Sequence, residues 1–185
     1  MKIWRELLGY VKLLVIVVAI ILVINNVVLI NAKIPSPSME KTLMVKDRLF
    51  GFRVAYGINL NLFGHEISEK FKDPKRFDIV IFKYPDDESR LFIKRVIGLP
   101  GEVVEIKDGK VYIDGSPTPL DDSFIPEKMI GSYGPYTVPE NCYFMLGDNR
   151  NDSKDSRLWK NKFVRFDQIE GKAVVRYYPS FKWLG

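Results

Sequence analysis

A run of twenty residues without a charged side chain, residues 13–32, constrains this 185-residue chain more than any other feature. Twenty residues of α-helix rise about 30 Å, which is the thickness of the hydrocarbon core of a bilayer. Its strongly polar members, Asn25, Asn26 and Asn31, lie toward its C-terminal end, where an interface or a partner can satisfy them. We therefore expect a transmembrane helix at 13–32.

The residues before this run predict its orientation. Three basic residues precede it against one acidic residue, namely Lys2, Arg5 and Lys12 against Glu6. Basic residues favour the cytoplasmic side of a membrane. We expect a single-pass protein of the cell membrane with a cytoplasmic N-terminus at 1–12 and an extracytoplasmic domain at 33–185.

A cleaved secretory signal is the competing interpretation of the same run. Such signals have an apolar region of about 7–15 residues, followed by a cleavage site of the small-x-small type. The run is longer than that, and its last residues, Ile30, Asn31 and Ala32, supply no such site. A retained helix is therefore the better interpretation.

Past residue 32 the pattern is typical of β-strands almost throughout. Short runs rich in β-branched and aromatic residues occur at 77–82, 91–97, 103–107, 110–114, 143–146 and 172–178. Asp108 and Gly109 separate two of these runs as a two-residue hairpin would. No long amphipathic helix is evident. We predict a mainly β fold, a sheet or barrel-like core with a small, loop-rich lobe inserted at 115–140.

The composition disfavours several kinds of site. One histidine, His65, and one cysteine, Cys142, leave Cys–His catalysis, Cys/His zinc sites and an internal disulfide with little or no support. A serine–histidine–aspartate triad could use only His65, whose surroundings at 63–66 look like a loop. No P-loop, Gly-x-Gly-x-x-Gly or Gly-x-Ser-x-Gly motif occurs. If the chain is an enzyme, lysine is the most available base.

The net charge of +5 and the pI near 9.2 suit anionic lipid headgroups or nucleic acid. With a membrane helix present, and without a basic stripe interleaved with stacking aromatic residues, we expect membrane lipid as a partner and no nucleic acid.

Ser38 and Lys94 together suggest a nucleophile and its base. Ser38 lies six residues past the apolar run, and strand alternation places Phe92 and Val96 on the same face as Lys94. Burial among apolar groups lowers the pKa of a lysine, which a lysine base requires. Taken alone, however, this segment is more typical of a snorkelling lysine at a strand edge.

The chain resembles the type I signal peptidases, membrane-bound serine–lysine endopeptidases that remove signal peptides from exported proteins. Three blocks carry the resemblance in the expected order: IPSPSMEKTL at 34–43, FDIVIF at 77–82 running on to IKRVIGLPGE at 93–102, and GDNRNDSKDSR at 147–157. The single span with a compact outer part is similar to the small Gram-positive form of the family.

This resemblance implies a role for each matching residue. Ser38 matches the nucleophile and Lys94 the general base, while Ser36, with the backbone N–H of Ser38, matches the oxyanion hole. Ser153 matches the hydroxyl that orients the base. Four further residues match a structural polar network near the site: Arg95, Asp148, Asp155 and Arg157.

Three positions depart from the family pattern. Pro37 precedes the nucleophile where glycine or another small or polar residue is frequent, Lys41 stands where proline is common, and Phe77 stands where glycine usually precedes the aspartate. These departures put the loop geometry in doubt and leave the nucleophile and base unchanged.

The resemblance also implies a mostly β catalytic core whose groove pairs with an extended signal peptide, selecting small residues at the first and third positions before the cut. It implies no metal and no cofactor. The stretch at 50–63 is more apolar than a loop should be, and two interpretations stay open: a surface that rests on lipid, or a core strand or groove edge.

Two rival functions follow from the same residues. A self-cleaving repressor-type protease shares the serine–lysine logic, but the membrane span and the lack of a DNA-binding domain oppose it. A membrane-tethered module that binds signal peptides without cutting them is the second, and the presence of both Ser38 and Lys94 disfavours it.

Overall fold

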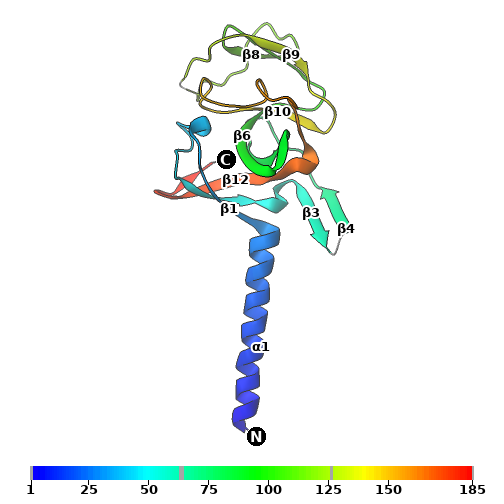
Figure 1. Cartoon of the computed structure of the whole chain (residues 1–185), viewed down its shortest axis with the longest axis vertical. Helices are drawn as coiled ribbons and strands as arrows, with labels where there is room; N and C mark the ends of the chain where they lie inside the picture. The colour runs from blue at the N-terminus through cyan, green and yellow to red at the C-terminus, as the bar shows by residue number, and fades with distance from the viewer. Residues whose placement is uncertain (1, 63–64, 126, 185) are drawn as a thin grey trace.

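A single long helix and a β domain make up the molecule (Figure 1). The structure is a computed structural model that describes residues 2–62, 65–125 and 127–184. The helix α1, Lys2–Val23, continues through a π-helical turn, Ile24–Val28, and stands clear of the β domain. Within Trp4–Val28 the helix is long and apolar enough to cross a membrane, with a mean hydropathy of 3.0.

The predicted helix at 13–32 ends too late, because the last residues of the apolar run form a strand. Strand β1, Leu29–Lys33, pairs antiparallel with β2, Arg48–Phe52. Ile30 is buried there in a core cluster with Ile34 and Leu49. An apolar run gives the same signal whether it faces lipid or fills a sheet core, so hydropathy alone could not separate the two parts.

The main sheet is antiparallel and has the order β1-β2-β12-β5-β6-β10-β11, with β13 added beside β12. Its remaining strands are β5 (Ile79–Tyr84), β6 (Asp87–Gly98), β10 (Cys142–Leu146), β11 (Val164–Arg165), β12 (Ile169–Tyr178) and β13 (Lys182–Trp183). Short 3-10 turns at Pro37–Met39, Arg53–Ala55 and Phe166–Gln168 complete it. The mainly β prediction is confirmed.

A second sheet of three strands forms the lobe that lies farthest from α1 (Figure 1). Strand β7, Val103–Lys107, lies between β8, Lys110–Ile113, and β9, Tyr133–Thr137. The predicted lobe at 115–140 is therefore too short, since its sheet begins at Val103. The predicted hairpin between β7 and β8 is confirmed, with Asp108 and Gly109 at φ of 49° and 77°.

The apolar stretch at 50–63 divides into two parts. Its first residues belong to β2, an interior strand of the main sheet, where Phe50 stacks on Tyr177 with ring centroids 4.5 Å apart. The following strand β3, Gly57–Leu62, pairs with β4, His65–Lys70, in a separate hairpin. His65 thus begins a strand, whereas a loop was expected; residues 63 and 64 of that expected loop lie outside the described residues.

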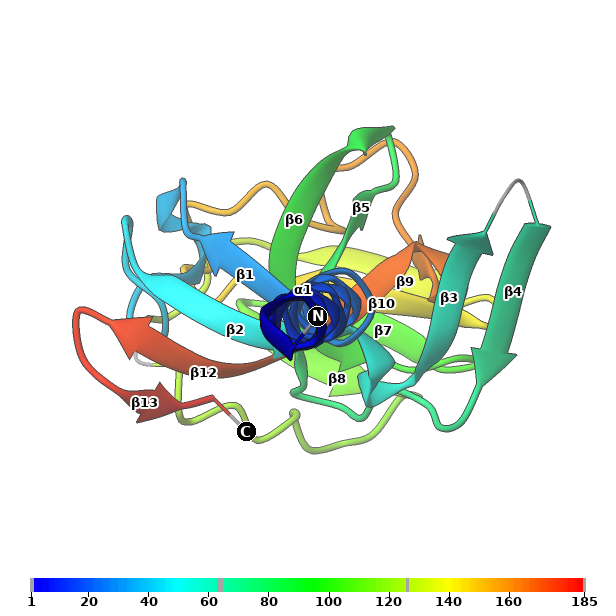
Figure 2. The same ribbon diagram turned by 90° about the horizontal axis from the view of Figure 1, so that it is seen from below.

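Seen along α1, the sheet strands nearest the helix spread to both sides of it (Figure 2). Strands β1, β2, β12 and β13 lie on one side, and the β3–β4 hairpin projects on the other. If α1 crosses a bilayer, these elements form the part of the β domain that faces the membrane.

Candidate active site

Ser38 and Lys94 lie against each other in the interior of the β domain. Ser38 belongs to the turn Pro37–Met39, and Lys94 lies on β6. The Lys94 Nζ is 2.6 Å from the Ser38 Oγ and donates a second hydrogen bond of 3.0 Å to the carbonyl of Ile93. The two residues are 7% and 3% exposed, so the pair is largely shielded from water.

The turn that carries Ser38 is fixed from both sides. Pro37 restricts the preceding Ser36 to extended backbone, which Ser36 adopts with φ −136° and ψ 158°. Met39 and Leu43 are fully buried below the turn. From above, the Asn149 backbone N–H donates to the Ser38 carbonyl at 3.1 Å. The proline before the nucleophile is thus compatible with an ordered turn.

The face of β6 that carries Lys94 is apolar, as the alternation predicted. Val96 is fully buried in the core cluster, and the Phe92 ring packs against the same cluster. The Lys94 Nζ lies 5.5 Å from the centroid of the Phe92 ring. Ile93 packs instead against the cluster on the opposite face.

These surroundings lower the pKa of Lys94. Burial lowers the pKa of Lys94 to about 8, against the charges of Asp155 and Asp148, which favour the ammonium form. At pH 7.4 a pKa of about 8 leaves roughly a fifth of the amine neutral, compared with roughly a thousandth at the ordinary lysine value. The neutral amine of Lys94 can therefore accept a proton from a hydroxyl near neutral pH.

Ser36 lies next to the pair, at the entrance of the site. Its Oγ is 3.4 Å from the Ser38 Oγ, and the residue is exposed. Ser38 is the second residue of its short helical turn, so its backbone N–H has no partner within that turn. A hydroxyl and a backbone N–H are therefore both present beside the nucleophilic oxygen.

Ser153 does not make the contact that the resemblance implied. Its side chain is buried, but among the described residues its Oγ has no hydrogen-bond partner, and Lys94 is not within bonding distance of it. The residue packs instead against Gly147, where an added Cβ would lie 2.1 Å from the Ser153 Oγ. Ser153 is thus placed beside the site but not bonded to the lysine.

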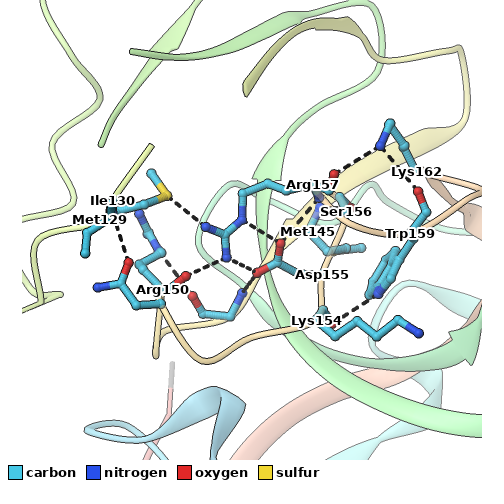
Figure 3. Close-up of polar contacts among 12 residues, drawn as sticks. Met129, Ile130, Met145, Arg150, Lys154, Asp155, Ser156, Arg157, Trp159 and Lys162 are labelled. Atoms are coloured by element: carbon cyan, nitrogen blue, oxygen red, sulfur yellow. Dashed lines mark hydrogen bonds and ion pairs between the residues drawn. The ribbon is translucent and has the colours of Figure 1, made fainter. Parts of the chain in front are cut away.

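The four network residues form two separate ion pairs around the site. The Arg95 Nε and Nη2 donate to the two carboxylate oxygens of Asp148 at 2.8 and 2.5 Å. Arg157 donates to both oxygens of Asp155 at 2.7 and 2.8 Å, as Figure 3 shows. Both carboxylates are fully buried. The Arg95–Asp148 pair fixes the segment that follows β10 against β6, and the Asp155–Arg157 pair lies within that segment.

Sequence reasoning missed three residues that hold the site together. Thr42 donates to Asp148 at 2.5 Å, the Asn149 side chain donates to the Pro37 carbonyl at 3.2 Å, and the Gly147 N–H donates to Asp155 at 3.0 Å. All three lie inside the blocks that carried the resemblance, which was the one available signal for them.

Two of the departures from the family pattern have left-handed backbone. Lys41 has φ 79° and Phe77 has φ 72°, a region that glycine adopts without strain and other residues rarely adopt. The Phe77 ring packs edge-on against Phe124 at 5.1 Å, and its carbonyl accepts a hydrogen bond of 2.8 Å from Arg95. These contacts hold Phe77 in the conformation that a glycine would take.

A cleft of about 520 Å³ opens beside Ser38 and Lys94. It adjoins an apolar groove of about 250 Å³ between β1 and β6, and four residues line both: Pro35, Leu91, Phe92 and Ile93. Strand β6 pairs with β10 only through residues 95–98, so its edge at 90–94 is free on that side. In the described ranges, no group of three or more histidine, cysteine or acidic side chains is placed to hold a metal ion.

Comparison with known proteins places this geometry in a family. The family model described as signal peptidase, peptidase S26, matches residues 7–178. The chain belongs to the signal peptidase family, peptidase S26. Its mainly β domain and apolar N-terminal helix fit a membrane-anchored enzyme of that family.

Curated members of the signal peptidase family are similar over most of the chain. The probable signal peptidase I-2 of Synechocystis is 40% identical over 152 residues, which cover 79% of this chain and 62% of that protein. The probable signal peptidase I-1 of the same organism is 34% identical over 187 residues, 97% of this chain and 87% of that protein. The chain thus spans less than two thirds of the first of these relatives.

A solved structure of a signal peptidase I from Enterococcus faecalis V583 is also similar. It is 37% identical and aligns with a TM-score of 0.46, covering 56% of this chain and 98% of that chain.

Proposed function

We propose that this protein is a membrane-bound serine endopeptidase that cleaves N-terminal signal peptides from exported preproteins. The observation that carries the proposal is the buried Ser38–Lys94 pair, with an Nζ to Oγ distance of 2.6 Å and a lowered lysine pKa. A nucleophile within hydrogen-bond distance of a base that is partly neutral near pH 7 is the arrangement that acyl transfer requires.

The reaction follows from the position of the two groups. The neutral Lys94 amine takes the Ser38 hydroxyl proton while the Oγ attacks the scissile carbonyl, giving a tetrahedral intermediate. The Lys94 ammonium then gives that proton to the leaving amine, the C–N bond breaks, and an acyl ester on Ser38 remains. Lys94 next takes a proton from water while the oxygen of that water attacks the ester. The C–Oγ bond then breaks, Lys94 returns the proton to the Ser38 Oγ, and the signal peptide leaves with a new carboxyl group at its C-terminus.

The oxyanion of the tetrahedral intermediate needs donors that are in place before the reaction. In this proposal they are the Ser36 hydroxyl and the Ser38 backbone N–H. The distance of 3.4 Å between the Ser36 and Ser38 Oγ atoms supports the role of Ser36, because it places that hydroxyl next to the attacking oxygen.

Ser153 is the hydroxyl that orients Lys94 in this proposal. Its buried Oγ has no hydrogen-bond partner among the described residues, so its donor is not committed to another group. The Arg95–Asp148 ion pair keeps the segment that carries Ser153 against β6, and Asp155–Arg157 orders that segment internally.

The substrate fits as an added strand. A peptide laid along the free edge of β6 at 90–94 can form main-chain hydrogen bonds there, and its alternate side chains can enter the apolar groove beside β1. The groove is lined mostly by apolar side chains, which suits uncharged substrate side chains there. Small residues at the first and third positions before the cut are what the resemblance implies.

Membrane lipid is a second partner in the proposal. The helix supplies the anchor, and the basic residues before it favour a cytoplasmic N-terminus, which puts residues 33–185 outside. Near the helix exit, the β12–β13 hairpin exposes three large aromatic side chains, Tyr178, Phe181 and Trp183. Aromatic side chains are enriched at membrane interfaces, which supports contact of this hairpin with headgroups.

Incubation of the purified full chain in detergent with a preprotein, followed by mass spectrometry of the products, tests the proposal. We expect one cut, after a small residue with another small residue two positions earlier. Binding of the preprotein without a cut would favour the signal-peptide-binding module instead. Cuts at large residues, or at many sites, would contradict the assigned specificity.

A further inference from the structure

Two cationic side chains line the catalytic cleft. Arg90 lies near the start of the free edge of β6, and Lys154 follows Ser153 in the loop across the cleft. Both residues are exposed. Within the ranges that the structure describes, neither forms an ion pair, whereas Arg76, Arg95, Arg157 and Arg165 all do.

An aromatic platform positions both cations. The rings of Tyr84 and Phe92 stack with centroids 4.4 Å apart, and Trp159 packs edge-on against both. The Arg90 guanidinium lies 5.3 Å from the Phe92 ring and 5.9 Å from the Tyr84 ring. The Lys154 Nζ lies 5.7 Å from the Tyr84 ring. Cation–π contacts hold a charge in place without neutralising it, so the N–H donors stay available.

Asp86 interacts electrostatically with Lys154, but within the described residues it forms no ion pair with it. Asp86 accepts hydrogen bonds from the Tyr84 hydroxyl at 2.8 Å and from the backbone N–H groups of Lys160 and Asn161 at 3.0 and 2.7 Å. Asp152 is the acidic residue that lines the cleft, against the cations of Arg90, Lys154 and partly charged Lys94. The cleft therefore has an excess of positive charge next to the nucleophile.

The alternation of β6 indicates which substrate residue would meet these cations. Arg90, Phe92 and Lys94 share one face of the strand, and Leu91 and Ile93 share the other. Leu91 and Ile93 line the apolar groove, which Phe92 also reaches from the first face. A peptide paired with this edge alternates in the same way. When its first and third side chains before the cut enter the groove, its second side chain points toward the face of Arg90.

We propose that Arg90 and Lys154 form a subsite for a carboxylate side chain at the second position before the cut. The inference rests on the proposed function and extends it from small-x-small to small-acidic-small. The chemical class that the subsite selects is an aspartate or glutamate side chain, which can accept hydrogen bonds from both cations while its peptide backbone pairs with β6.

The test uses three signal peptides that differ only at this second position, Ala-Asp-Ala, Ala-Asn-Ala and Ala-Lys-Ala, and the full chain in neutral detergent. We expect kcat/KM for the Asp peptide to exceed that for the Asn peptide by about two- to fivefold, the range that exposed ion pairs provide. The Lys peptide should be the slowest. At about 1 M salt, where charges are screened beyond roughly 3 Å, the preference should largely disappear.

Variants of Arg90 and Lys154 test whether these two residues cause the preference for the Asp peptide. The Asp/Asn ratio should fall to about one in Arg90→Gln/Lys154→Gln, and Arg90→Glu should favour the Lys peptide. The control Lys110→Gln, an exposed lysine on β8, should keep the parent ratio. An Asp/Asn ratio of one in the parent, or a ratio unchanged in the double variant, would overturn the inference.

A binding measurement separates this inference from the proposed function. Cleavage of the Asn peptide after its second alanine supports the proposed function whatever the ratio. If no peptide is cut, the proposed function fails, and the Asp/Asn ratio of dissociation constants for the full chain still tests the subsite. Equal dissociation constants would then overturn the subsite as well.

Discussion

The Asn149 backbone N–H donates a 3.1 Å hydrogen bond to the Ser38 carbonyl, and this contact joins two segments that are more than a hundred residues apart in the chain. The Asn149 side chain adds a bond of 3.2 Å to the Pro37 carbonyl. The loop after β10 thereby holds the turn that presents the Ser38 hydroxyl. Small changes in that loop should move the nucleophile relative to Lys94.

Gly147 is the residue of this loop at which a side chain would disturb the Ser38 turn most directly. A Cβ added there would lie 2.4 Å from the Ser38 carbonyl oxygen and 2.1 Å from the Ser153 Oγ. The Ser38 backbone cannot yield without shifting its turn, so we expect Gly147→Ala to destabilise the fold by about 1–3 kcal/mol and to abolish most cleavage. Thermal unfolding and kcat/KM measure the two effects. Gly9→Ala, which adds a Cβ in open space, is the matched control.

The pH dependence of cleavage should report the amine of Lys94. With its pKa lowered to about 8, the neutral base forms as the pH rises, so kcat/KM should increase through about pH 8. Val96→Thr introduces a hydroxyl on the apolar face of Lys94, which favours the ammonium form and should move this rise to higher pH. Ile97→Val, on the opposite face of β6, should leave it in place.

Ser153→Ala separates orientation from protonation in the same experiment. We expect it to lower the plateau of the pH profile of kcat/KM without moving the rise, because the alanine removes the hydroxyl proposed to orient Lys94 but leaves the burial of Lys94 intact.

For the Val96 prediction, a rise at the same pH in the parent and in Val96→Thr would contradict the idea that this face of β6 sets the protonation of Lys94.

The stability of the domain should carry a second signature of the same pKa. Because the folded pKa of Lys94 lies below its unfolded value, the unfolded chain binds the extra proton, and stability increases as pH rises from about 8 to about 10.4. Lys94→Met should therefore be more stable than the parent at pH 7, by up to about 3 kcal/mol. The difference should close by about pH 10.4.

Denaturant unfolding in detergent across this pH range measures the difference. Lys110→Met, which replaces an exposed lysine, should give a difference from the parent that does not change with pH. A pH-independent difference for Lys94→Met as well would contradict the lowered pKa.

The strands could be predicted from the sequence because side-chain alternation is a local signal. The alternation at 91–97 placed Phe92 and Val96 on the face of Lys94, and both pack in one core cluster. The roles of Ser38 and Lys94 came from the resemblance and stay predictions. The end of the helix and the start of the lobe could not be predicted in this way. Whether Ile30 faces lipid or a sheet core depends on its pairing with Gly51, which is a tertiary contact.

The cations of the cleft escaped sequence reasoning for a related reason. Arg90 and Lys154 are far apart in the chain, and nothing local relates either of them to Tyr84. Their common position follows from the pairing of β5 with β6 and from the return of the loop after β10. Ser153 shows the converse, because its block was recognised but the direction of its hydroxyl is set by packing on Gly147.

The orientation in the membrane makes a separate prediction. Residues exposed on the β domain should react from outside the cell, and residues before the helix should not. In a Cys142→Ala background, Lys182→Cys on β13 should label with a membrane-impermeant thiol reagent on intact cells that lack an outer membrane. Glu6→Cys should label only after lysis. The reverse pattern would show that the domain is cytoplasmic.

A double-mutant cycle on the Ser38–Lys94 pair tests the central claim most directly. The measurement is kcat/KM for one signal peptide with the parent, Ser38→Ala, Lys94→Met and the double variant, each shown to be folded by its thermal unfolding. Because the two groups act as one unit, we expect each single variant to lose as much activity as the double variant, on the order of a thousandfold or more. Either single variant within tenfold of the parent, or losses that add in the double variant, would contradict the proposed serine–lysine mechanism.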